Sequence, residues 1–170
     1  LSAAMEVAGA PTDQFRIEVD MRVTFFSGGI VHFRGPDPDN GYRIRVNTST
    51  SVLPVTLQKV VNGAATTLAS VNTGKGPGSW LHLIIQVEGD QIHILETESS
   101  TDIVVSDNTF IGAAGVLLGG TAGTTAFDNL SIESTLPPGV IFADDFESTP
   151  VGTLSPDYVQ LQGTTNVIGG

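Results

Sequence analysis

Apolar and charged residues alternate along this chain with a period of two, most regularly near its N-terminus. In the segment Phe15–Val23 every odd residue is apolar and every even residue is charged. This is the period of a β-strand with one face on a core and the other in water. Residues 30–34 and 42–46 alternate in the same way and are also predicted to be strands. No helical pattern extends beyond about two turns.

Turn-forming residues separate these strands. The segment Gly35–Gly41 contains two prolines and an Asn-Gly pair, so we expect a turn or loop there. Asn62 and Gly63 form the strongest short hairpin signal, between strands predicted at residues 53–61 and 64–71.

A further hairpin can be tested for register. Strands predicted at residues 80–88 and 91–97 are joined by Gly89-Asp90, and a two-residue turn there places Val87 opposite Ile92 and Ile85 opposite Ile94. The apolar residues of both strands then share one face. Shorter strands are predicted at residues 103–105, 115–118 and 125–132. Turn signals about every ten residues indicate an all-β fold, a two-sheet antiparallel sandwich.

Composition narrows the class of protein. A chain of 170 residues can bury the core of one domain. Eighteen acidic residues against seven basic ones give a net charge of −11, which argues against nucleic acid and anionic membranes as partners. The longest apolar runs are only a handful of residues, so insertion into a membrane is not expected. The chain lacks cysteine, an initiator methionine and a signal peptide, so we interpret it as mature, processed or cut from a longer chain. Abundant Thr, Ser, Gly, Val and Asn predict an extracellular or cell-surface location.

The sequence offers little for catalysis. Glycoside hydrolysis needs two carboxyl groups roughly 5–10 Å apart, and the nearest approach to such a pair is Glu96 and Glu98, for which a solvated face is the favoured interpretation. His32, His82 and His93 lack metal-ligand spacing, and each is predicted to be structural. We therefore predict that the chain is not an enzyme.

The order of four segments resembles the laminin-G-like group of concanavalin A-like jelly rolls. These segments are FRGPDPDNGYRIRV, LQKVVNGAATTLAS, GSWLHLIIQVEGDQIHI and GAAGVLLGGTAGTTAFDNLSIES. The resemblance covers residues 15–134 and implies a jelly-roll sandwich. The tail segment VIFADDFES resembles the strand that usually opens such a module, yet here it comes last. The chain therefore looks circularly permuted, or like one unit of a series.

This reading divides the chain into a jelly-roll body at residues 1–134, a Pro-Gly connector at 135–139 and a C-terminal segment at 140–170. The segment could close on its own body, complete a neighbouring copy by strand donation, or belong to a tandem array. Ile141, Phe142 and Phe146 are expected to enter the sandwich. The residues predicted to carry the assembly are Ile141, Phe142, Phe146, Tyr158, Leu161, Val167 and Ile168.

The resemblance also implies that the opening and closing strands are neighbours, where a structural calcium is common in similar jelly rolls. The expected ligands are Asp128, Asn129, Asp144, Asp145 and Glu147, since calcium prefers carboxylate and amide oxygens. The alternative is that these residues only keep an edge strand soluble. The loop Asp37–Asn40 is a second calcium candidate, although Asp and Asn are also common in plain turns. No other cofactor is expected.

A sugar site would need planar polar groups and aromatic residues on a concave surface. The candidate residues are His32, Arg34, Tyr42, Arg43 and Arg45. Trp80 is predicted to pack in the core instead. Aromatic residues make up only 6% of the chain, which is low for a sugar-binding module.

The sequence thus favours a non-enzymatic extracellular structural module that assembles with copies of itself into a filament, tube or repeat array through its C-terminal segment. The alternative is a carbohydrate-binding, lectin-like module of a larger secreted protein, with glycans as partners. A jelly-roll hydrolase ranks third.

Overall fold

The computed structural model describes residues 3–7, 14–24, 27–48, 51–120, 124–134, 140–144 and 158–162. Within these ranges the chain forms thirteen β-strands and no helix, so no described helix could cross a membrane. The strands of the first half are β1 (Ala3–Val7), β2 (Phe15–Val23), β3 (Gly28–Asp37), β4 (Asn40–Asn47), β5 (Pro54–Val61) and β6 (Ala64–Asn72). Those of the second half are β7 (Trp80–Glu88), β8 (Gln91–Glu96), β9 (Thr101–Ser106), β10 (Val116–Gly120), β11 (Thr125–Ser134), β12 (Val140–Asp144) and β13 (Tyr158–Gln162).

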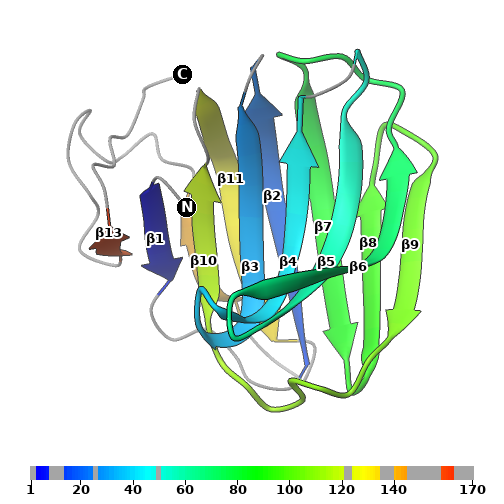
Figure 1. Ribbon diagram of the computed structural model, residues 1–170. Helices are drawn as coiled ribbons and strands as arrows, with labels where there is room; N and C mark the ends of the chain where they lie inside the picture. The colour runs from blue at the N-terminus through cyan, green and yellow to red at the C-terminus, as the bar shows by residue number, and fades with distance from the viewer. Residues whose placement is uncertain are drawn as a thin grey trace.

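The strands form two antiparallel sheets packed face to face, a jelly-roll β-sandwich (Figure 1). In the described residues the seven-stranded sheet has the order β13-β1-β10-β3-β4-β5-β6, and the six-stranded sheet has the order β12-β11-β2-β7-β8-β9. The all-β, two-sheet prediction is confirmed.

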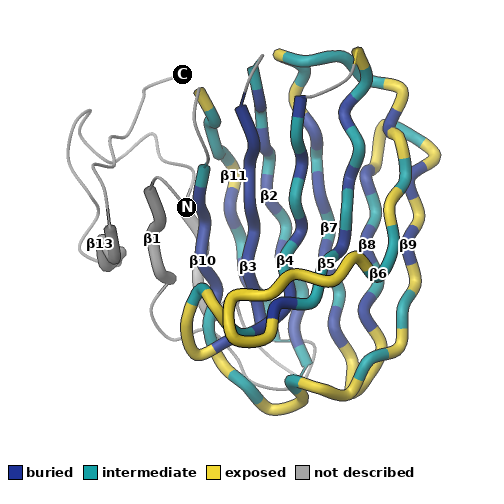
Figure 2. Tube along the Cα trace, viewed as in Figure 1, coloured by how far each residue is buried: buried dark blue, intermediate teal, exposed yellow. Residues whose placement is uncertain are grey.

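The core lies between the sheets and follows from the alternation in the sequence. Every odd residue of β2 is fully buried, and every even residue is partly exposed. Three aromatic rings anchor the centre: the Phe33 ring lies 6.4 Å from Phe15 and 5.9 Å from Tyr42, centroid to centroid. Figure 2 shows the buried residues alternating with partly exposed ones along the central strands. Burial of such apolar side chains is the main stabilising contribution to the fold.

The register predicted for the β7–β8 hairpin is confirmed. Val87 pairs with Ile92 and Ile85 with Ile94, and all four side chains are fully buried. Asn62-Gly63 also forms the predicted tight turn, between β5 and β6.

The β3–β4 connection differs from the prediction of a seven-residue loop. Strand β3 continues to Asp37 and β4 begins at Asn40, so the turn is only Pro38-Asp39. The extra residues are accommodated by a register shift between Phe33 and Asp37. Arg34 lies at this shift with a φ of 48°, a left-handed conformation that breaks the strand alternation.

The C-terminal segment contributes one strand to each sheet. Strand β12 pairs antiparallel with β11 at the edge of the six-stranded sheet, with Asp144 opposite Leu130. Strand β13 pairs with β1 at the edge of the seven-stranded sheet. Both strands thus lie against the same chain, as in the first of the three arrangements considered. The use of this segment in assembly stays a prediction.

Candidate carbohydrate-binding face

The candidate site is the outer face of the seven-stranded sheet, where β4 carries two arginines. Tyr42, Ile44 and Val46 are fully buried in the core. Because successive strand residues point to opposite sides of a sheet, the intervening Arg43 and Arg45 lie on the outer face, and both are half-buried.

Strand pairing defines the neighbours of these arginines. Arg43 lies opposite His32 on β3 and Gln58 on β5, and Arg45 lies opposite Ile30 and Thr56. Arg43 and Arg45 thus each begin a row of paired residues across the sheet, and hydrogen bonds continue both rows to β6. Gln58 Nε2 donates to Thr67 Oγ1 at 3.5 Å, and the hydroxyls of Thr56 and Ser70 lie 2.8 Å apart. We call Arg43, Arg45, Thr56, Gln58, Thr67 and Ser70 the arginine face.

Arg43 is held in place by its neighbour on β5. Its Nε donates to Gln58 Oε1 at 2.8 Å. Burial lowers the pKa of Arg43, and the positive charge of Arg45 lowers it further. The guanidinium nevertheless stays charged at any physiological pH, because an arginine pKa begins above 12.

Arg45 is bound less tightly. Its Nε is enclosed and has no hydrogen-bond partner in the described part of the chain. An enclosed donor without a partner costs free energy.

The floor under the arginines is apolar. Ile30 and Leu117 belong to the outer face, but each is only 4% exposed. Long arginine side chains cover apolar surface with their methylene stems and keep the charged end in water. The face therefore combines an apolar base with charged and hydroxyl groups, as sugar sites do.

The β5–β6 hairpin frames this face at one end. The strands bend at a register shift next to Gln58, and β6 crosses in front of the sheet as the exposed strand in Figure 2. Its tip is fixed to the β3–β4 turn: the Gly63 amide donates to the Asp39 carbonyl at 2.9 Å, and the Asn62 amide donates to Asn40 Oδ1 at 3.0 Å.

His32 belongs to the outer face by register but is 1% exposed. Its Nε2 lies 3.0 Å from the Asn40 carbonyl and donates to it. The turn packs so closely that a Cβ on Gly41 would lie 2.6 Å from this nitrogen. Burial lowers the pKa of His32, so the ring is neutral at pH 7. The described environment is that of a structural histidine and leaves no room for a sugar.

Two other predicted sugar residues lie inside the sandwich, which corrects their assignment to the site. Arg34 is fully buried and donates to the Gly89 carbonyl at 2.5 Å. Tyr42 is also fully buried. Its hydroxyl donates to Asp107 Oδ1 at 2.6 Å, and Lys59 Nζ lies 2.6 Å from the other oxygen of that carboxylate.

The contact of Tyr42 with the partly exposed pair Asp107 and Lys59 affects two pKa values. Burial raises the pKa of Tyr42 to about 12, and its hydrogen bond to Asp107 acts in the same direction. Burial alone would raise the pKa of Asp107, but hydrogen bonds from Lys59, Thr109 and Tyr42 lower it well below its usual range. The cluster is structural and ties β4 to the segment after β9.

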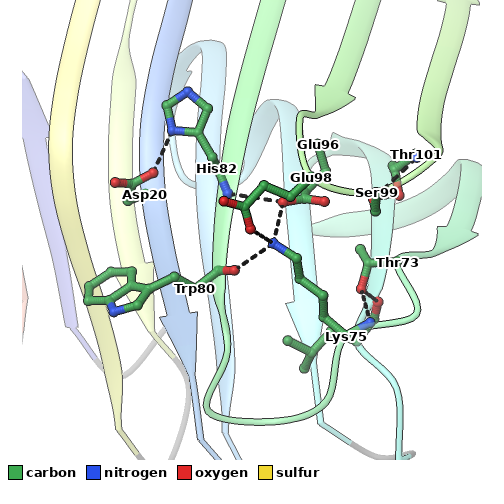
Figure 3. Close-up of polar contacts among 10 residues, drawn as sticks. Asp20, Thr73, Lys75, Trp80, His82, Glu96, Glu98, Ser99 and Thr101 are labelled. Atoms are coloured by element: carbon green, nitrogen blue, oxygen red, sulfur yellow. Dashed lines mark hydrogen bonds and ion pairs between the residues drawn. The ribbon is translucent and has the colours of Figure 1, made fainter.

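The outer face of the six-stranded sheet carries a different set of polar groups. Trp80 is 39% exposed, with the Arg22 guanidinium 4.9 Å from the ring centroid, so the prediction of a core tryptophan is wrong. His82 Nδ1 lies 2.6 Å from Asp20 Oδ1 (Figure 3), and His93 Nε2 lies 2.8 Å from Asp102 Oδ1. Each histidine thus has an acidic partner.

Glu96 and Glu98, the nearest approach to a catalytic pair in the sequence, share one lysine. Lys75 Nζ lies 2.8 Å from Glu96 and 2.7 Å from Glu98, and it also donates to the Trp80 carbonyl (Figure 3). Burial alone would raise the pKa of Glu96, but the bonds from Lys75 and Ser99 lower it. The Glu96 carboxylate is therefore ionised at neutral pH and is not kept protonated as a general acid must be.

The predicted calcium ligands are only partly described. Asp128 accepts a hydrogen bond from the Asn129 amide at 2.8 Å, and Asn129 Nδ2 donates to Asp20 at 2.7 Å, which turns this amide nitrogen toward the acid. Asp144 lies in β12, whereas Asp145 and Glu147 lie outside the described residues. Within the described part of the chain no three acidic or histidine side chains gather as metal ligands. The calcium site stays a prediction.

The loop candidate for calcium is explained as a turn. Asp37 Oδ1 accepts hydrogen bonds from the Asp39 amide and from Asn40 Nδ2, which is the local bonding that Asp and Asn make in turns.

The structure places some of the predicted assembly residues in strands. Ile141 and Phe142 lie in β12, and Tyr158 and Leu161 lie in β13. Phe146, Val167 and Ile168 lie outside the described residues. Their role in assembly stays a prediction.

Comparison with known proteins identifies the fold. No family model matches the chain, and no curated protein matches it in sequence. Among solved structures, the carbohydrate-binding module CBM66 from Bacillus subtilis matches with a TM-score of 0.67 and 25% identity, over 79% of this chain and 84% of that chain. A toad ovary galectin in complex with thio-digalactose matches at a TM-score of 0.59 and 12% identity, over 78% of this chain and all of that chain (100%). An ancestral congerin matches at a TM-score of 0.57 and 14% identity, over 75% of this chain and 98% of that chain.

These matches establish a concanavalin-like jelly roll and support that part of the predicted resemblance. Laminin-G-like membership and circular permutation stay predictions. At the identity of the galectin and congerin matches, the likeness concerns the fold alone.

Proposed function

We propose that the chain is a non-catalytic carbohydrate-binding, lectin-like module that binds sugar on the arginine face. This was the alternative interpretation of the sequence. The observation that carries the proposal is the pair Arg43 and Arg45 on one outer strand face, with the Arg45 Nε enclosed and unbonded to any described residue.

Three further features support this function. Hydroxyl and amide groups of Thr56, Gln58 and Ser70 stand beside the arginines and can bond to sugar hydroxyls. The floor is apolar and enclosed. The similarity in fold and sequence to a carbohydrate-binding module adds weight. An extracellular or surface location, where such glycans occur, is part of the same proposal.

Self-assembly receives less support. Both tail strands pair within the chain, so the sheet edges beside β11 and β1 are occupied without a second copy. Glycans are therefore the partner we propose, while self-association stays a prediction.

The test is binding of the intact chain to a glycan panel. We expect at least one glycan to bind, and the double substitution Arg43→Gln with Arg45→Gln to abolish that binding. Arg16→Gln is the matched control, because Arg16 lies on the outer face of the other sheet, beside Glu18. Binding that survives the double substitution, or a panel with no ligand, would refute the proposal.

A further inference from the structure

The charges of the arginine face are not neutralised by any carboxylate in the described part of the chain. Three of the cations form ion pairs: Arg16 with Glu18, Lys59 with Asp107, and Lys75 with Glu96 and Glu98. Arg22 stacks on Trp80, and Arg34 is buried against a carbonyl. Arg43 and Arg45 have no ion pair with a described carboxylate. This is unexpected in a chain with eighteen acidic and seven basic residues.

The strands nearest to the arginines supply no acid either. From β10 to β6 the register row of Arg43 contains Leu117, His32, Gln58 and Thr67, and that of Arg45 contains Gly119, Ile30, Thr56 and Ser70. None of these is acidic, and His32 is neutral. The first acid in the row of Arg43 is Glu6 on β1, three strands away from β4. A site for an uncharged sugar commonly uses carboxylates to accept bonds from hydroxyls, but these rows present arginine donors, neutral amides and hydroxyls.

We infer that the ligand of the arginine face is an acidic glycan, whose carboxylate or sulfate groups bind Arg43 and Arg45. The inference rests on the proposed function and specifies the class of sugar. Guanidinium groups bind carboxylate and sulfate oxygens through two parallel hydrogen bonds. The arginines are two residues apart on β4, so their Cα atoms are about 7 Å apart, close enough to hold one anionic group between them or two groups on adjacent sugars.

Partial burial strengthens this preference. Two like charges on a half-buried surface repel each other, and an anion between them replaces repulsion with attraction. A neutral sugar would leave the repulsion in place. The acidic surface elsewhere on the molecule disfavours long polyanions, so the contact depends on acidic groups reaching this face.

The experiment compares short acidic glycans with matched ones that lack one kind of acidic group. Oligogalacturonates are paired with their methyl-esterified forms, which are neutral. Short oligosaccharides of sulfated chondroitin are paired with unsulfated ones, which keep the carboxylate, to separate sulfate from carboxylate. Titration calorimetry on the intact chain should give at least tenfold tighter binding to one acidic member than to its partner. That affinity should fall as salt is raised.

Substitutions assign the effect to the arginines. Arg45→Gln should reduce acidic-glycan affinity at least tenfold. Arg45→Lys keeps the positive charge but loses the guanidinium group that forms two parallel hydrogen bonds, so it should retain part of the affinity. Arg16→Gln should have no effect, and a melting curve for each variant controls for folding. Acidic-glycan affinity that is equal in wild type and Arg45→Gln would overturn the inference.

The panel also separates this inference from the proposed function. In one outcome, neutral glycans bind as tightly as acidic ones and lose affinity in Arg45→Gln. The proposed sugar-binding function would then stand, and the preference for acidic ligands would be overturned. No binding to any glycan would overturn both.

Discussion

Replacement of Arg45 should weaken ligand binding at least tenfold without destabilising the fold. The Arg45 Nε has no described hydrogen-bond partner, and the like charge of Arg43 stands on the same face of β4. Two unit charges about 7 Å apart repel by about 0.6 kcal/mol in water and by about 2 kcal/mol at an effective dielectric constant near 20. Arg45→Gln relieves this repulsion and keeps a polar side chain.

The substitution also removes packing. Glutamine has one methylene fewer than arginine, a loss of about 0.8 kcal/mol if that group is buried. Relief of repulsion and loss of packing act in opposite directions. The free energy of unfolding of Arg45→Gln should therefore be either unchanged or higher than that of the wild type by up to about 1.5 kcal/mol. Any increase should shrink as salt screens the repulsion.

Urea denaturation of wild type and Arg45→Gln measures this difference, provided that the m value is unchanged. Arg16→Gln serves as control and should lose less than about 1 kcal/mol with its surface ion pair. A loss above about 1 kcal/mol for Arg45→Gln would show that the fold itself depends on Arg45. The reasoning that this side chain is kept for a ligand would then fail.

Three further predictions concern the rest of the molecule. Lys75→Met leaves the buried Glu96 carboxylate without its cation and should lower the free energy of unfolding by about 3 kcal/mol. Glu98→Gln, at an exposed position, should change the free energy of unfolding by less than about 1 kcal/mol. Equal effects of the two substitutions would contradict the structure. The pKa of Tyr42 is raised to about 12, so its contribution to the free energy of unfolding is complete below about pH 10 and is lost as the pH rises toward 12. The pKa of Asp107 is lowered, so its contribution to the free energy of unfolding is present above about pH 4 and is lost on acidification. Tyr42→Phe should remove the alkaline loss, and an unchanged alkaline profile would refute this. A calcium site at the β11–β12 edge, which needs residues beyond β12, predicts a higher Tm in calcium than in chelator; equal values would exclude it.

Much of the fold could be predicted from the sequence, because alternation and turn residues are local signals. The pairing of Val87 with Ile92 follows from a two-residue turn and needs no tertiary information. Strand β1 escaped prediction because the run Ala-Ala-Met-Glu-Val has weak alternation. Its pairing with β10 and β13 is a long-range property of the fold.

The site was predictable in part. Alternation along β4 already places Arg43 and Arg45 opposite to Tyr42, so assigning Tyr42 to the same surface ignored a signal that was present. Arg34 was not predictable in this way. It follows His32 by two positions and should share its face, but the left-handed backbone at Arg34 turns the side chain inward.

Trp80 was predictable in the same way as Arg43. The alternation along β7 places it on the face opposite to Leu81 and Ile85, and there it lies opposite Arg22 of β2. Thr56 and Ser70 could not be assigned to the site from the sequence, because hydroxyl groups are common on outer strand faces. Only their position beside the arginines in the fold makes them candidates for sugar binding.

The most direct test of the account is to map where a glycan binds. An isotope-labelled sample of the intact chain is titrated with the tightest ligand of the panel, and the shifts of backbone amide signals are followed by NMR. The account predicts that the largest shifts fall on Arg43, Arg45, Thr56 and Gln58. Shifts concentrated on the outer face of the six-stranded sheet, around Trp80, would contradict it.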